Sequence, residues 1–227
     1  MKVIVVGASG MVGQGVLREC LLADDVQGVL SVGRRPLEKI PAGTTRDKLV
    51  DRVVPDLTDL SAIEGDLAGY DACFFCLGIA SAGMTEDAYR RVTHDIPAAF
   101  AKVLARLNPD MTFVFVSGAG TDSTEKGSTM WARVKGAAEN AVLKAGFKRA
   151  YMFRPGIIQP LHGIVSRTTA YRVFYVLLWP LVLLLKLIPG VVTTTERIGR
   201  AMLIAARRGA PQIYLQNRDI NALAASE

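Results

Sequence analysis

A glycine-rich turn close to the start of the chain has the residue types and the spacing that bind phosphate. Its glycines follow a short apolar run and precede a helical pattern. Glycines allow a tight turn and a close approach of the backbone to a pyrophosphate, and the next helix presents unpaired N–H groups. The spacing differs from G-x-G-x-x-G by one residue in its first gap, and an ordinary tight turn could use the same glycines. We expect a dinucleotide here, bound by Gly7, Ser9, Gly10, Met11, Val12 and Gly13.

Two adjacent arginines, Arg34 and Arg35, follow the second apolar run at 29–32. NAD-selective folds place an Asp or Glu at this point, where it bonds the ribose hydroxyls, and this chain has neither. Guanidinium groups here would accept a 2′-phosphate through charge-assisted hydrogen bonds. The two residues could also be surface arginines of a loop. We expect NADP(H) in preference to NAD(H).

Residues after the third and fourth apolar runs complete the expected cofactor site. Asp56 is placed either to bond the adenine amino group or to cap the helix that follows it. Gly78 would let the backbone pass close to the cofactor ribose. Their neighbours Leu57 and Leu77 belong to the same expected set.

The three cysteines, Cys20, Cys73 and Cys76, do not predict a disulfide framework. Cys73 and Cys76 have the spacing of a redox pair, but residues three apart on a strand point to opposite faces. The run at 3–6 has only four apolar residues, too few for a secretory signal. We therefore expect a reducing cytoplasmic location and no metal site.

Short apolar runs alternate with helical patterns along the first two thirds of the chain. The expected strands are 3–6, 29–32, 50–54, 72–77, 112–116 and 149–153, and the expected helices are 11–23, 85–107 and 129–144. Fully apolar strands separated by helices indicate a parallel sheet covered on both faces. The sequence predicts an α/β fold, a doubly wound parallel sheet of Rossmann type. We divide it into a dinucleotide-binding domain at 1–155 and a small C-terminal lobe at 156–227.

The composition excludes a disordered chain, because half of the residues are hydrophobic. The formal net charge is +6, which suits a phosphorylated ligand, a nucleic acid or an anionic membrane surface without choosing among them. No basic helix with interleaved aromatic residues is present, so we expect no nucleic-acid partner. The oligomeric state is left open.

A continuous apolar stretch occupies 173–185, with Pro180 near its middle. At about 13 residues it is too short to span a bilayer as a helix, which needs about 20. It could cover the cofactor cleft as a substrate lid, form an interface with a protein partner, or make peripheral contact with a membrane through 173–188. Each use predicts an apolar small-molecule substrate or an apolar partner.

Seven segments in order resemble the atypical or extended short-chain dehydrogenase/reductases. The likeness extends to NmrA-like, epimerase/dehydratase-like and Tat-interacting NADPH-binding proteins, and it covers roughly residues 1–205. The segments are GASGMVG, SVGRRP, CFFCLGIA, FVFVSGAG, WARVKG, FRPGI and TERIGRAM.

The resemblance implies roles for three residues in proton transfer. In that family a Ser after the fifth strand positions the substrate carbonyl, a Tyr exchanges the proton, and a Lys four residues later binds the nicotinamide ribose. Ser117 and Lys135 match the Ser and the Lys, and Trp131 stands at the Tyr position. An indole N–H only donates a hydrogen bond and cannot exchange a proton as a phenol does. The resemblance also adds Pro155, Gly156, Ile157 and Ile158 to the cofactor site.

Three functions are compatible with these residues. The first is an NADP-dependent oxidoreductase that acts on an apolar small molecule and takes its proton from Ser117, water or His162. The second is a non-catalytic NADP(H)-binding regulator that reports redox state to a partner. The third is another chemistry on a bound small molecule.

Overall fold

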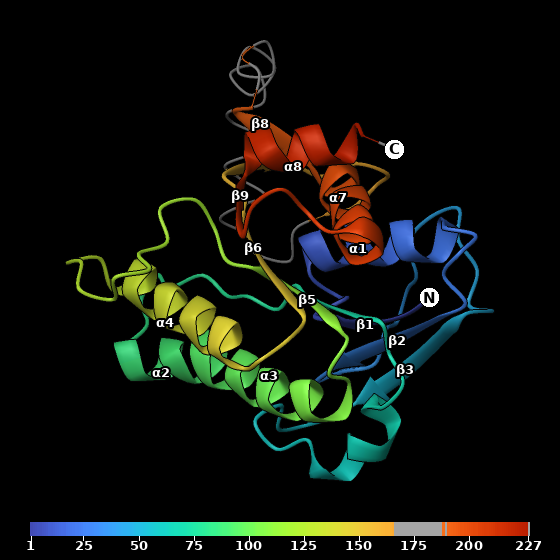
Figure 1. The fold of residues 1–227 in the computed structure, drawn as a ribbon, viewed down its shortest axis with the longest axis horizontal. Coiled ribbons are helices and arrows are strands. Elements are labelled where there is room, and N and C mark those ends of the chain that lie inside the picture. Colours follow the sequence, from blue (N-terminus) through green and yellow to red (C-terminus); the bar gives the residue numbers. More distant parts are fainter. Residues whose placement is uncertain (166–187, 189, 227) are drawn as a thin grey trace.

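The computed structural model describes residues 1–165, 188 and 190–226, and within them a parallel sheet of seven strands forms the centre of the molecule (Figure 1). Its strand order is β3-β2-β1-β4-β5-β6-β9, and every neighbouring pair is parallel. The predicted doubly wound sheet is therefore confirmed. The strands are β1 (Lys2–Val6), β2 (Gly28–Gly33), β3 (Leu49–Val53), β4 (Ala72–Phe75), β5 (Thr112–Val116), β6 (Arg149–Arg154) and β9 (Tyr214–Gln216).

Helices cover both faces of the sheet, as the apolar strands require. On one face α1 (Met11–Leu22) packs against α7 (Thr195–Arg208), which packs against α8 (Asn217–Ala224) (Figure 1). On the other face lie α3 (Ile96–Leu107) and α4 (Met130–Lys144).

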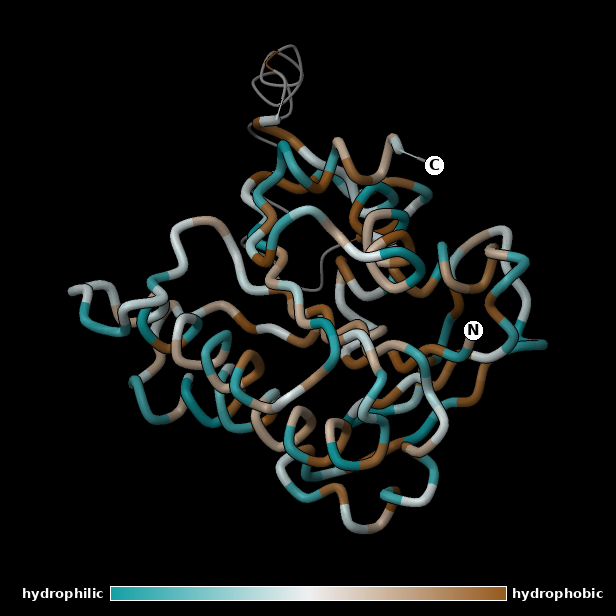
Figure 2. Tube along the Cα trace, in the orientation of Figure 1, coloured by the Kyte–Doolittle hydropathy of each residue, from teal (hydrophilic) through white to brown (hydrophobic). Residues whose placement is uncertain are grey.

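Strand β1 shows how the sequence builds these two layers. Its residues Val3, Ile4, Val5 and Val6 are completely buried. Successive side chains of a strand point to opposite faces, so Val3 and Val5 join the core under α1 and α7, while Ile4 and Val6 join the core under α3. In Figure 2 hydrophobic residues follow the strands, and hydrophilic residues gather on loops and outer helix faces.

The strand order places a binding crevice at the carboxyl end of β1. Here β2 and β3 lie on one side of β1 and β4 lies on the other, so the chain crosses β1 between β3 and β4. In open α/β sheets such a reversal leaves a crevice outside the carboxyl ends of the strands, where ligands bind. The glycine-rich turn follows β1 at this position.

The helix expected over 85–107 is interrupted. It begins as α2 (Glu86–Arg90), widens into a π turn (Arg91–Asp95) and continues as α3. Pro97 has no N–H to bond the carbonyl of Thr93, and its ring crowds that carbonyl, which favours the wider turn.

Several short elements were not expected from the sequence. They are a 3₁₀ helix (Ser61–Leu67), a small parallel sheet of β7 (Ile157–Gln159) and β8 (Val192–Thr194), strand β9 and helix α8. Strand β9 pairs with β6, so the C-terminal part of the chain adds an edge to the main sheet. The boundary at residue 155 stays a prediction.

The apolar stretch 173–188 lies outside the described residues except for Ile188. Among the residues that the structure does describe, no helix is both long and apolar enough to cross a bilayer.

Candidate functional site

The glycine-rich turn is packed so tightly that two of its glycines leave no room for a side chain. Gly7 has a φ of +83°, and a Cβ there would lie 2.7 Å from the backbone nitrogen and Cα of Leu77. A Cβ on Gly13 would lie 2.1 Å from the carbonyl oxygen of Gly7, which also accepts a 3.0 Å hydrogen bond from the Gly10 amide. Both distances are shorter than real Cβ contacts, so these two positions require glycine. The two glycines let β1, α1 and the end of β4 lie close together.

The N-terminus of α1 is left without a side-chain cap. Gly10 is the cap residue, and the first turn of the helix carries no acidic residue. The first N–H groups of a helix have no partner inside it, and the helix dipole adds partial positive charge there. The end of α1 therefore offers amide donors and a favourable potential to an anion.

Arg34 and Arg35 extend this positive potential. The Gly7 amide donates a 3.2 Å hydrogen bond to the Val32 carbonyl, which joins the turn to the end of β2. Both arginines come directly after that strand and are exposed. Neither forms an ion pair with a carboxylate among the described residues.

The other residues expected near the adenine and ribose occupy different surroundings. Asp56 is exposed and accepts hydrogen bonds from the amide and hydroxyl of Thr58, at 2.9 and 2.6 Å, and these bonds lower the pKa of its carboxyl. Leu57 is buried, whereas Leu77 lies against Gly7. Gly78 is exposed, and a Cβ there would meet no atom of the described residues within 4 Å. Their cofactor roles stay predictions.

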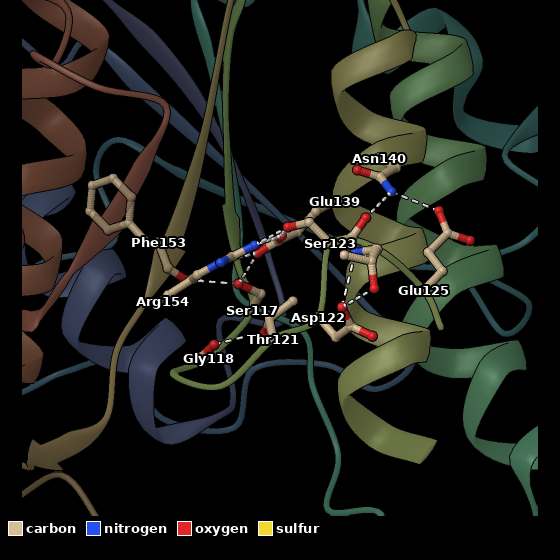
Figure 3. A network of polar contacts seen from close by, with 11 residues as sticks. Ser117, Gly118, Thr121, Asp122, Ser123, Glu125, Glu139, Asn140, Phe153 and Arg154 are labelled. Atoms are coloured by element: carbon tan, nitrogen blue, oxygen red, sulfur yellow. Dashed lines mark hydrogen bonds and ion pairs between the residues drawn. The ribbon is translucent and has the colours of Figure 1, made fainter. Parts of the chain in front are cut away.

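A buried polar network lies at the carboxyl ends of β5 and β6 (Figure 3). Glu139 of α4 is fully buried and accepts a 2.5 Å hydrogen bond from the hydroxyl of Ser117. Arg154, at the end of β6, donates from Nε to the Glu139 carboxylate at 2.9 Å, and its Nη2 reaches both Glu139 and the hydroxyl of Ser123. The Ser117 amide also bonds the Phe153 carbonyl at 2.8 Å.

The ion pair between Glu139 and Arg154 keeps this network together. A buried carboxylate needs a paired cation, and the guanidinium supplies one with two donors. Hydrogen bonding to Glu139 in turn raises the pKa of Arg154. The Arg154 guanidinium carbon also lies 4.4 Å from the centre of the Tyr214 ring, a cation–π contact that ties β9 to β6.

Sequence reasoning missed Glu139 and Arg154, although both left a signal. Glu139 stands four residues after Lys135 on one helix face, among buried alanines. Arg154 follows three buried residues of β6 and precedes Pro155. A charged residue at the end of an apolar strand or on a buried helix face needs a partner of opposite charge.

Lys135 brings a cation to the same edge of the sheet. Its ammonium group donates a hydrogen bond to the carbonyl oxygen of Ser117. Desolvation lowers the pKa of Lys135 to about 8, and the Glu139 charge acts against that shift. The structure thus brings Ser117 and Lys135 together, as the family pattern implies.

Trp131 lies on the same face of α4 as Lys135, one turn before it. The side chain is half-buried, and a Cβ on Gly120 would lie 3.2 Å from the indole Cη2, so the ring rests on the loop after β5. His162 is exposed, and its ring nitrogen Nε2 lies at hydrogen-bond distance, 2.6 Å, from the Glu196 carboxylate. In the described part of the chain its ring makes no hydrogen bond to Ser117 or Lys135.

The segment 155–158 is fixed between the loop after β5 and the start of α8. The carbonyl of Pro155 accepts a 2.9 Å hydrogen bond from the Ala119 amide. Asn217 accepts from the Gly156 amide at 3.1 Å and donates to the Ile157 carbonyl at 3.3 Å. These bonds hold the segment beside the polar network, at the same edge as the glycine turn.

Comparison with known proteins assigns the family. The chain is 30% identical over 157 residues to "Protein HTATIP2" of Rattus norvegicus, a match that covers 69% of this chain and 62% of that protein. It is 32% identical over 160 residues to "Protein FMP52, mitochondrial" of Eremothecium gossypii, covering 70% and 66%. The chain belongs to the atypical short-chain dehydrogenase/reductases. No family model matches it.

Solved structures in this family's fold agree with that assignment. "Bordetella bronchiseptica enzyme WbmF in complex with NAD+" superposes with a TM-score of 0.68 at 17% identity, covering 99% of this chain and 76% of that one. A "thiolation-reductase di-domain from an archaeal non-ribosomal peptide synthetase" gives 0.67 at 14% identity, covering 90% and 67%. At these identities the likeness shows the fold alone, an α/β fold of Rossmann type.

The chain spans 62% and 66% of the length of the two curated relatives named above. The expected cytoplasmic location is wrong by this comparison, because several relatives are named as mitochondrial proteins. Sparse free cysteines indicate a reducing environment, and they do not distinguish one reducing compartment from another.

Proposed function

We propose that this family member binds NADP(H) along the carboxyl edge of its sheet. The observation that carries the proposal is the uncapped N-terminus of α1 beneath a turn in which Gly13 has no room for a side chain. This cradle of amide donors fits a pyrophosphate, and the two unpaired arginines beside it fit a 2′-phosphate. When bound, the nicotinamide supplies hydride transfer. The proposed contacts are Gly7, Ser9, Gly10, Met11, Val12, Gly13, Arg34, Arg35, Asp56, Leu57, Leu77, Gly78, Lys135 and 155–158.

Lys135 would hold the nicotinamide ribose. Its ammonium lies at the end of β5 and already bonds a backbone carbonyl, so it is positioned before a ligand arrives. The charge of Glu139, one helical turn away, favours the ammonium form. The network of Figure 3 would hold Ser117 in place, and the Ser117 carbonyl in turn accepts the hydrogen bond that orients Lys135.

As the chemistry of the site we propose oxidoreduction of an apolar small molecule. Trp131 takes the place of a proton-exchanging tyrosine and offers an apolar surface that excludes water from the reacting atoms. The proton would come from the Ser117 hydroxyl or from water, and the Lys135 ammonium would stabilise negative charge on the substrate oxygen.

A second candidate function, a non-catalytic NADP(H)-binding regulator, is favoured by one specific observation. The Ser117 hydroxyl donates its hydrogen to Glu139, and the serine is only 4% exposed. With that donor engaged and no phenol at position 131, neither family proton donor faces the substrate. The bound cofactor would then report redox state to a partner.

Titration calorimetry tests the cofactor choice. The double variant Arg34→Ala/Arg35→Ala should lose at least about tenfold in NADPH affinity, because charge-assisted hydrogen bonds contribute about 1.5–3 kcal/mol each. Its NADH affinity should change little. The control Lys126→Ala/Lys144→Ala removes two exposed cations elsewhere and should leave both affinities unchanged. Equal losses for NADPH and NADH would refute the 2′-phosphate assignment.

NADPH consumption, screened over apolar aldehydes, ketones and quinones, separates the two candidate functions. An oxidoreductase should turn over at least one class, and Lys135→Ala should reduce that turnover strongly. Tight cofactor binding with no turnover in any class would favour the regulator. Turnover that survives both Ser117→Ala and Lys135→Ala would exclude the proposed site.

A further inference from the structure

A pocket of about 610 Å³ is lined by residues of α7 and α8. These two helices lie on the same face of the sheet as α1 (Figure 1). The walls of the pocket come from the start of α7, from α8 and from the chain before β8. None of its lining residues belongs to the proposed cofactor site. The residues that matter for its chemistry are Ile188, Val192, Arg197, Arg200, Arg218 and Asn221.

Three arginines give this pocket a positive charge. Arg197 and Arg218 are exposed, and neither has an ion-pair partner in the part of the chain that the structure describes. Arg200 bonds Glu196 at 2.9 Å and Glu19 at 3.4 Å. Among the described residues of the lining Glu196 is the one acidic residue, and its carboxylate also contacts His162. Like charges that meet around one pocket repel each other unless an anion enters.

The pocket also contains an unsatisfied acceptor. Asn221 donates from its side-chain nitrogen to the Val192 carbonyl at 3.0 Å, whereas its side-chain oxygen is buried without a hydrogen-bond partner among the described residues. A buried acceptor left unpaired destabilises the fold. A ligand that carries both an anionic group and a hydroxyl would satisfy the arginines and this oxygen together.

One wall of the pocket is apolar. Ile188 is 54% exposed and lines the pocket, and the buried Val192 lies in the same lining. In the sequence the apolar stretch 173–185 ends three residues before Ile188. Basic side chains next to exposed apolar residues are typical of surfaces that meet anionic lipid.

We propose that this arginine pocket binds the phosphate headgroup of an anionic phospholipid, with phosphatidylglycerol as the representative ligand. The phosphate would lie among Arg197, Arg200 and Arg218, and a headgroup hydroxyl would donate to Asn221. The apolar wall at Ile188 favours a lipid over a free phosphate, because a soluble anion gains nothing from an exposed aliphatic side chain.

Vesicle sedimentation tests the proposal on the full chain. The wild type should bind phosphatidylcholine vesicles that contain phosphatidylglycerol and should bind pure phosphatidylcholine much more weakly. The variant Arg197→Gln/Arg218→Gln should lose about thirtyfold in partitioning, since each basic residue near an anionic surface contributes about one factor of five. The matched control is Lys102→Gln/Lys144→Gln, which removes two exposed cations from the α3–α4 face and should lose much less.

Two further results decide the matter. Equal vesicle binding by the wild type and by the folded arginine variant would overturn the proposal. So would saturable binding of glycerol 3-phosphate without any vesicle binding, because the occupant would then be a soluble phosphate. Should the arginine variant fail to fold, amide hydrogen exchange of the wild type replaces it: anionic vesicles should protect α7 and α8, and unchanged exchange there would equally refute the lipid site.

Discussion

Replacement of Glu139 by glutamine is the sharpest test of the polar network. The carboxylate is fully buried and accepts hydrogen bonds from Ser117 and Arg154. Glutamine has nearly the shape of glutamate but carries no charge. Its side-chain NH₂ group would face Ser117 and Arg154, which are hydrogen-bond donors themselves. Removing one partner of a buried ion pair costs about 3–5 kcal/mol, and the 13% exposure of the Arg154 side chain places the loss at about 3 kcal/mol.

Urea unfolding followed by circular dichroism measures this loss. For a chain of this length about 3 kcal/mol corresponds to a fall in Tm of about 6–12 °C. The matched control is Glu64→Gln, which breaks the exposed ion pair with Arg106 and should cost less than about 1 kcal/mol. The double variant Glu139→Leu/Arg154→Met should be more stable than Glu139→Leu alone, because it leaves no unpaired buried charge. A loss for Glu139→Gln no larger than for Glu64→Gln would refute the reasoning.

Three further predictions concern single residues of the site. Gly13→Ala should abolish NADPH binding and destabilise the fold in calorimetry, because its Cβ would lie 2.1 Å from the Gly7 oxygen. The control Gly65→Ala should be nearly neutral, because its Cβ would meet no atom of the described residues within 4 Å. Similar losses for both variants would contradict the packing argument. NADPH should perturb tryptophan fluorescence, and Trp131→Phe should remove most of that change, leaving Trp179 as background; an undiminished signal would place the cofactor elsewhere. Lys135 loses its proton near pH 8 in the folded chain and near 10.5 when unfolded, so the folded state binds fewer protons between these values. Its contribution to the free energy of unfolding should therefore rise with pH across that window, and Lys135→Met should remove the rise; an identical pH slope in both proteins would show that this lysine is not desolvated.

The sequence predicts the sheet from β1 to β6 well because each of these strands is signalled locally. Apolar runs such as 3–6 and 72–75 are buried on both faces, so they need no pattern beyond their own residues. The glycine turn is equally local, since its spacing and its flanking elements lie within a few residues.

The missed features depend on contacts between distant residues. Strands β7, β8 and β9 have three residues each and exist because they pair with segments far along the chain. The carboxylate of Glu139 meets Arg154 only because α4 packs beside β6. The π turn before α3 depends on one missing N–H at Pro97, which a helical pattern alone does not reveal.

Binding of NADPH to the purified protein tests the central claim most directly. Calorimetric titration should give saturable binding at one site per chain, tighter for NADPH than for NADH, and Gly7→Val should remove it because Gly7 adopts a φ of +83°. A correctly folded wild type that binds neither dinucleotide would contradict the account.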